Sequence, residues 1–184
     1  MADGKKKKSG KKTGPDWGWI LFIFVITMVI SAAMSFISSR LLGNAGMAVS
    51  FLILICIVAI GIVFDIIGVA VTAADPRPFH SMAAHKEKGA REALNLLRNA
   101  SHVSSVCNDV VGDICGIVSG ATGAVIVTQL QSALNTRTVL ISVGVTALVS
   151  GLTIGGKALS KTFAMKQSTK VVYWVGRFLH VFHR

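Results

Sequence analysis

Acidic residues are scarce in this chain of 184 residues, in which eight Asp and Glu stand against 19 Lys and Arg, for a net charge of +11. Hydrophobic residues nevertheless make up 52% of the sequence, and the mean hydropathy is +0.65. Basic and apolar residues therefore occupy separate segments, which is the pattern of an integral membrane protein with basic ends. A chain of this length has no room for a sizeable domain outside the membrane.

Cysteine is also rare, and its placement argues against a disulfide framework. Cys56, Cys107 and Cys115 all lie in apolar segments, where the expected role is that of a small buried packing residue. The sequence contains no phosphate-binding glycine loop, no nucleophile and base arrangement, and no histidine at metal-ligand spacing from a cysteine. We therefore do not expect an enzyme.

Four continuous apolar runs are long enough to cross a bilayer, which takes about 20 residues of helix. They cover residues 17–39, 47–74, 103–130 and 138–159. None of them alternates between apolar and polar residues, which excludes a closed barrel. The sequence therefore predicts an all-α integral membrane protein with four transmembrane helices.

The basic residues predict the orientation of these helices. They gather in residues 5–12, in the segment between the second and third runs, and at the C-terminus, whereas the two opposite turns hold only Arg40 and Arg137. Both termini are therefore expected in the cytoplasm, and the membrane is expected to be the bacterial cytoplasmic membrane. Residues 1–16 should be disordered, and their lysines are expected to set topology and to contact anionic lipid rather than nucleic acid.

Two further helical segments are expected on the cytoplasmic side. The juxtamembrane segment, residues 75–102, opens with Asp-Pro-Arg-Pro, which ends the preceding helix, and a helix is predicted over residues 82–97. Residues 165–184 place apolar side chains at helical spacing and basic ones on most of the remaining surface. This last segment is expected to be an amphipathic helix that lies on the membrane surface.

Charged residues inside the apolar runs are the candidate functional residues. Asp109 and Asp113 lie one helical turn apart, so an α-helix places both on one face. Asp65 and Lys157 lie at a similar depth, and a carboxylate at bilayer depth costs several kcal/mol. Carboxylates in this setting suit Mg²⁺ or shared protons. The alternative is a set of structural ion pairs in which Lys157 neutralises an aspartate.

Glycines accompany these charged residues. Gly112, Gly116 and Gly120 form two small-xxx-small steps, which let a neighbouring helix approach closely, either within the chain or from a second protomer. Gly156 precedes Lys157, and it either packs closely or loosens the helix so that backbone carbonyls can reach an ion.

Four short motifs follow one another in a fixed order. They are Phe64-Asp65-Ile66-Ile67-Gly68-Val69-Ala70, Lys88-Gly89-Ala90-Arg91-Glu92-Ala93-Leu94-Asn95-Leu96-Leu97, Asn108-Asp109 through Asp113, and Gly156-Lys157-Ala158-Leu159-Ser160-Lys161-Thr162-Phe163-Ala164. In this order, residues 47–184 resemble the transmembrane domain of the cyclin-M/CorC family of magnesium transporters. The resemblance implies three spans, a juxtamembrane segment, a surface belt helix and a homodimer. Residues 17–46 then form an extra helix and turn.

The resemblance also implies a set of Mg²⁺-site residues. Asp65 stands where the family has a serine, Asp109 and Asp113 where it has asparagines, and Lys157 where it has a glutamate. Gly68 replaces a second family glutamate. Gly68, Asn108, Gly112 and Gly156 are therefore expected to shape the backbone and packing near the site. The CBS pair that usually follows in the family is not found in these 184 residues, so ATP-linked regulation within this chain is not expected.

The expected function is transport of a divalent cation, Mg²⁺, through a site built from Asp65, Asp109 and Asp113. Lys157 would then be a tethered counter-charge that pairs with the acids when the ion is absent. The alternative is a membrane scaffold without transport, in which Lys157 locks the intramembrane aspartates permanently.

Overall fold

The computed structural model describes residues 17–43, 45–135 and 139–182, and within these ranges it is all-helical. The elements are α1 (Trp17–Leu42), α2 (Met47–Ala73), α3 (Arg77–Ala84), α4 (Ala90–Arg98), α5 (Ala100–Ser104), the π-helix η1 (Ser105–Gly112), α6 (Asp113–Ala133), α7 (Val139–Lys166) and α8 (Ser168–Phe182). The predicted disordered tail, residues 1–16, lies outside the described part of the chain, as does Arg137.

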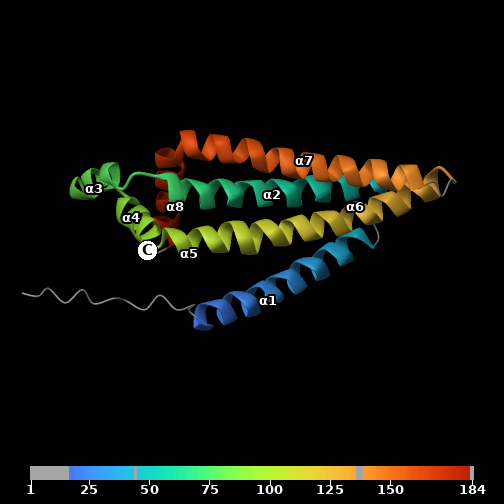
Figure 1. Ribbon diagram of the computed structural model, residues 1–184, viewed down its shortest axis with the longest axis horizontal. Coiled ribbons are helices and arrows are strands. Elements are labelled where there is room, and N and C mark those ends of the chain that lie inside the picture. Colours follow the sequence, from blue (N-terminus) through green and yellow to red (C-terminus); the bar gives the residue numbers. More distant parts are fainter. Residues whose placement is uncertain (1–16, 44, 136–138, 183–184) are drawn as a thin grey trace, which may run out of the picture.

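Four helical rods are long and apolar enough to cross a membrane, which confirms the prediction of four transmembrane helices. They are α1, α2, α7, and the continuous rod of α5, η1 and α6 over Ala100–Ala133. The four rods lie side by side along the long axis of the molecule (Figure 1). The third rod is the most buried of the four and contacts each of the other three.

The outer surface of these rods is apolar, as lipid requires. Trp17, Leu140 and Leu159 are 75%, 78% and 76% exposed, and many other large hydrophobic side chains on the four rods are also exposed. In water such a surface would cost roughly 25 cal/mol for each Å² left uncovered. In a bilayer it carries no such cost, so the surface fits a chain that lies within the membrane.

The juxtamembrane segment is not the single helix that was predicted over residues 82–97, and that prediction is wrong. The segment forms α3 and α4, separated at residues 85–89, where Lys86 has φ 57° and Gly89 has φ 87°. Such left-handed conformations end a helix, and glycine adopts them without strain. Gly89 is also crowded, because an added Cβ would lie 2.6 Å from Arg177 Cα in α8.

The predicted surface helix is observed as α8, which runs across the ends of the long rods beside α4 (Figure 1). A cluster of buried residues joins it to its neighbours. Its members come from five helices and are Ala70, Val71, Phe79, Ala93, Ala164 and Val172. The cluster fixes the ends of α2 and α7 relative to each other, and the charged residues of interest lie about two turns beyond it.

Candidate functional site

An ion pair between a buried aspartate and a partly buried lysine joins α2 to α7. Asp65 is only 4% exposed, and its Oδ2 lies 3.3 Å from Lys157 Nζ. Lys157 reaches it from the part of α7 that packs against α2. Removing a charge from water is costly unless the charge finds a partner. Pairing therefore explains how both Asp65 and Lys157 can lie at this depth.

The third rod completes this cluster through its backbone. Lys157 Nζ also donates a hydrogen bond to the carbonyl oxygen of Gly112, at 3.2 Å. Gly112 is the last residue of η1, and an added Cβ would lie 2.6 Å from Asp65 Oδ1 and 3.4 Å from Lys157 Nζ. The absence of a side chain at Gly112 therefore lets three transmembrane rods meet around one ammonium group.

Asn108 lies against α2 one turn before Gly112. Its side chain fills the space over Gly68, where an added Cβ would overlap the amide. Asn108 Nδ2 donates to Ser104 Oγ at 3.1 Å, but Asn108 Oδ1 is buried and accepts no hydrogen bond within the described residues. An unpaired buried acceptor costs free energy, so a hydrogen-bond donor or a cation would bind favourably at this position.

Asp109 and Asp113 do not join this cluster. Both are exposed on the single chain, and within the described residues neither forms an ion pair. The reason is rotational, because Asn108 and Gly112 already take the positions that face α2, and the two acids each follow one of them along the helix.

The cluster therefore presents two oxygen atoms to the Lys157 ammonium, and a third oxygen lies nearby on the same side of α2. These are the carboxylate of Asp65, the carbonyl of Gly112 and, beside Gly68, the amide oxygen of Asn108. Within the described residues no three His, Cys, Asp or Glu side chains gather closely enough to hold a metal ion. A cation at this place would depend on one carboxylate and on neutral oxygens, which suits Mg²⁺ with several of its waters retained.

Sequence reasoning assigned Asn108 to packing, and it did not foresee its oxygen as a candidate ligand. The signal that could have found it is the pair of Gly68 and Asn108, because a glycine facing an asparagine leaves room for the amide. Gly156 plays a simpler part. An added Cβ there would lie 2.5 Å from Ile62 Cδ1, so the glycine allows α7 to approach α2.

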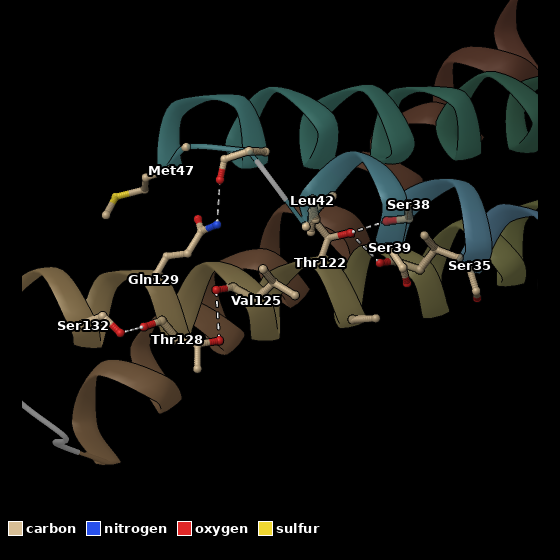
Figure 2. A pocket seen from close by; sticks show the side chains of 15 residues that line it. Ser35, Ser38, Ser39, Leu42, Met47, Thr122, Val125, Thr128, Gln129 and Ser132 are labelled. Atoms are coloured by element: carbon tan, nitrogen blue, oxygen red, sulfur yellow. Dashed lines mark hydrogen bonds between the residues drawn. The ribbon is translucent and has the colours of Figure 1, made fainter.

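A pocket of about 730 Å³ lies at the other end of the rods, between the end of α1, the start of α2, and α6. Hydroxyl groups line it (Figure 2). Gln129 Nε2 donates a hydrogen bond to the carbonyl oxygen of Ala45, at 3.1 Å. Its lining contains no charged side chain. Met47 at its rim is 18 residues from Asp65, about 27 Å along α2. The pocket is thus separate from the ion-pair cluster.

Residues 51–184 match the family described as the cyclin M transmembrane N-terminal domain, CNNM. The match covers well over half of the chain and includes α7, α8 and the part of α2 that carries Asp65, whereas α1 lies outside it. Among curated proteins and among solved structures the chain has no match. Four membrane-spanning rods, a surface helix at their ends and this family match lead to one conclusion: the chain belongs to the CNNM family, which is associated with Mg²⁺ transport rather than with catalysis.

Proposed function

We propose that the chain transports a divalent cation, Mg²⁺, past the cluster of Asp65, Asn108 and Gly112. One observation carries this proposal: the unpaired Asn108 Oδ1 lies on the same side of α2 as the buried Asp65 carboxylate. Buried oxygen acceptors left without a donor are what a cation site contains before the cation arrives. Family membership supports Mg²⁺ as the transported ion.

In this proposal Lys157 holds the site while it is empty. Its ammonium is bound by the Asp65 carboxylate and the Gly112 carbonyl, so the pair carries no net charge. An arriving divalent cation competes with the ammonium for these oxygens. Lys157 is 26% exposed at its side chain, and its long flexible stem lets the ammonium swing aside while the ion passes.

A scaffold without transport is the second candidate, and the same ion pair favours it. If the ammonium never leaves, Lys157 permanently links α2, α7 and the third rod. Loss of one partner from a buried pair typically costs about 3–5 kcal/mol. A scaffold of this kind would therefore depend on Lys157 for its stability and would show no response to Mg²⁺.

The deciding experiment is Mg²⁺ uptake into proteoliposomes, followed with an enclosed fluorescent indicator. The parent chain is compared with Asp65→Asn, Lys157→Met and Asp113→Asn. Asp113→Asn is the matched control, because it removes the same charge from an exposed position next to Gly112. We expect uptake in the parent and in Asp113→Asn. Uptake should be at least tenfold lower in Asp65→Asn, a factor that corresponds to about 1.4 kcal/mol. Uptake should be retained or faster in Lys157→Met.

The opposite result is equally clear. No uptake by the parent or by Lys157→Met, while a known Mg²⁺ transporter is active in the same vesicles, would contradict transport. A collapse of the thermal unfolding midpoint in Lys157→Met would then support the scaffold. Equal loss of uptake in Asp65→Asn and Asp113→Asn would instead move the site to include the exposed acids.

A further inference from the structure

An apolar groove of about 540 Å³ lies between α2, α7 and α8, on the outside of the bundle. It is lined by residues of α2, of the C-terminal end of α7 and of α8. The apolar lining includes Ile66, Ile67, Phe163 and Trp174, and the only charged side chain in it is that of Lys170. The groove is therefore an apolar trough with a single cation in its lining.

The α7 and α8 sides of the groove carry basic residues and no acidic ones. Asp113 is the last acidic residue of the sequence, so the whole of α7 and α8 lacks a carboxylate. Lys161, Lys166, Lys170 and Arg177 are all exposed there. Arg177 also lies over the ring of Trp174, with 6.0 Å from its Cζ to the ring centroid. Any ligand of this groove meets an electropositive surface.

The place of the groove indicates which ligand reaches it. α8 crosses the ends of the transmembrane rods (Figure 1). The end of a membrane-spanning helix is where lipid headgroups meet hydrocarbon. Tryptophan is typical of that level of the membrane, and basic pockets between transmembrane helices bind anionic headgroups. A lipid tail occupies such a trough without crossing water, whereas a free anion would gain nothing from its apolar floor.

We propose that this groove binds one anionic phospholipid. An acyl chain lies against Ile67, Phe163 and Trp174, and the phosphate is held by the ammonium of Lys170 with Gln167 beside it. The bound lipid fills the space between α8 and α2, and it lies against Ile66, the residue next to Asp65. This binding is independent of transport, so it can be tested whether or not the chain moves Mg²⁺.

The test uses the full chain in phosphatidylcholine vesicles, with Trp17 and Trp19 replaced by phenylalanine so that Trp174 is the one remaining tryptophan. Trp174 fluorescence is quenched with brominated phosphatidylglycerol or brominated phosphatidylcholine at equal mole fraction. We expect about a fivefold preference for the anionic lipid, corresponding to roughly 1 kcal/mol for one basic residue at a membrane surface. Lys170→Gln should abolish this preference.

Lys161→Gln is the control, since it removes an equal charge from an exposed position outside the groove. It should leave the preference intact. Equal quenching by the two lipids in the parent would overturn the proposal, and so would an equal effect of Lys161→Gln and Lys170→Gln, which would indicate a diffuse surface charge. Added inorganic phosphate should not change the quenching, and displacement by it would point to a free-anion site instead.

Discussion

At the scale of single residues, one glycine serves the ion pair in two ways. Gly112 lies where the third rod faces Asp65 and Lys157, and it provides a carbonyl oxygen as well as the space for both side chains. Gly116 and Gly120 continue the same small-residue spacing, but added Cβ atoms there would meet nothing within 4 Å. Identical residues at regular spacing thus have different roles, which only their neighbours reveal.

Gly112→Ala should therefore disrupt the ion pair. The added methyl group would lie 2.6 Å from Asp65 Oδ1, and a short buried carboxylate has little freedom to move aside. We expect a loss of about 1–3 kcal/mol, the usual cost of overpacking, seen as a lower midpoint of thermal unfolding in detergent.

Gly116→Ala and Gly120→Ala are matched controls on the same rod. Open space surrounds both positions within the chain, so the midpoint should stay or rise slightly, because alanine favours a helix by about 1 kcal/mol over glycine. If all three substitutions lowered the midpoint equally, the special role of Gly112 would be refuted, and a second protomer against Gly116 and Gly120 would explain the result.

At the scale of elements, η1 carries the two residues of the third rod that lie against Gly68 and Asp65 of α2, namely Asn108 and Gly112. A π-helix bonds each residue to the fifth along the chain and commonly occurs at functional sites. Here it spans Ser105–Gly112 and ends at the carbonyl that accepts from Lys157. A sequence pattern based on an ordinary α-helix cannot anticipate this, since no residue type specifies a π-helix.

Gly176 lets α8 approach the start of α4 closely. An added Cβ at Gly176 would lie 2.5 Å from the carbonyl oxygen of Gly89 and 2.9 Å from Ala93 Cβ. Gly176→Val should therefore push α8 away from α4. We expect faster proteolysis at the junction of α7 and α8 and a loss of about 1–3 kcal/mol in unfolding free energy.

Gly151→Val gives the comparison for that experiment. Gly151 lies in α7 with nothing within 4 Å of an added Cβ, so the protease pattern should match the parent chain. Unchanged proteolysis in Gly176→Val would show that α8 does not depend on this contact for its position.

At the scale of the whole molecule, α1 is the element that the family match does not include. It nevertheless packs on the family portion, because Ile23, Ile30 and Met34 lie against the cluster of Ile57, Val110 and Ile114. Ser38 and Thr122 also share a hydrogen bond, with 3.3 Å between their hydroxyl oxygens. The homodimer expected from the resemblance stays a prediction, and so do the orientation of the termini and the bacterial membrane.

The docking of α1 can be tested by cross-linking. Ser38→Cys with Thr122→Cys should form a disulfide on mild oxidation, because the two side chains already touch. Cys56 is replaced by alanine because it is exposed, whereas Cys107 and Cys115 are buried. A protease site is placed in the turn between α1 and α2, and the cleaved protein is run on a non-reducing gel. The α1 fragment separates from the rest of the chain only where no disulfide links them.

Phe36→Cys with Thr122→Cys is the matched pair that should not cross-link, since Phe36 is 62% exposed and is not the partner of Thr122. Equal cross-linking of the two pairs would mean that α1 rotates freely on α6 and has no fixed register.

Local composition determined much of this protein. Continuous apolar runs of more than 20 residues can only be satisfied as helices in a bilayer, so the four rods followed directly from the sequence. Asp-Pro-Arg-Pro ended α2 at Ala73, and apolar spacing after residue 165 located α8, because proline chemistry and helical periodicity act within a few residues. Family membership likewise followed from short motifs in order.

Only the tertiary structure decided which charges meet. Asp65 and Lys157 are 92 residues apart along the chain, and their contact depends on how α2 and α7 are rotated against each other. Asn108 and Gly112 of the π-helix lie against α2, whereas Asp109 and Asp113, one residue further along the chain, are exposed. Residue spacing gives the period of a helix but not its absolute rotation, because that rotation is set by packing against neighbours far away in the sequence.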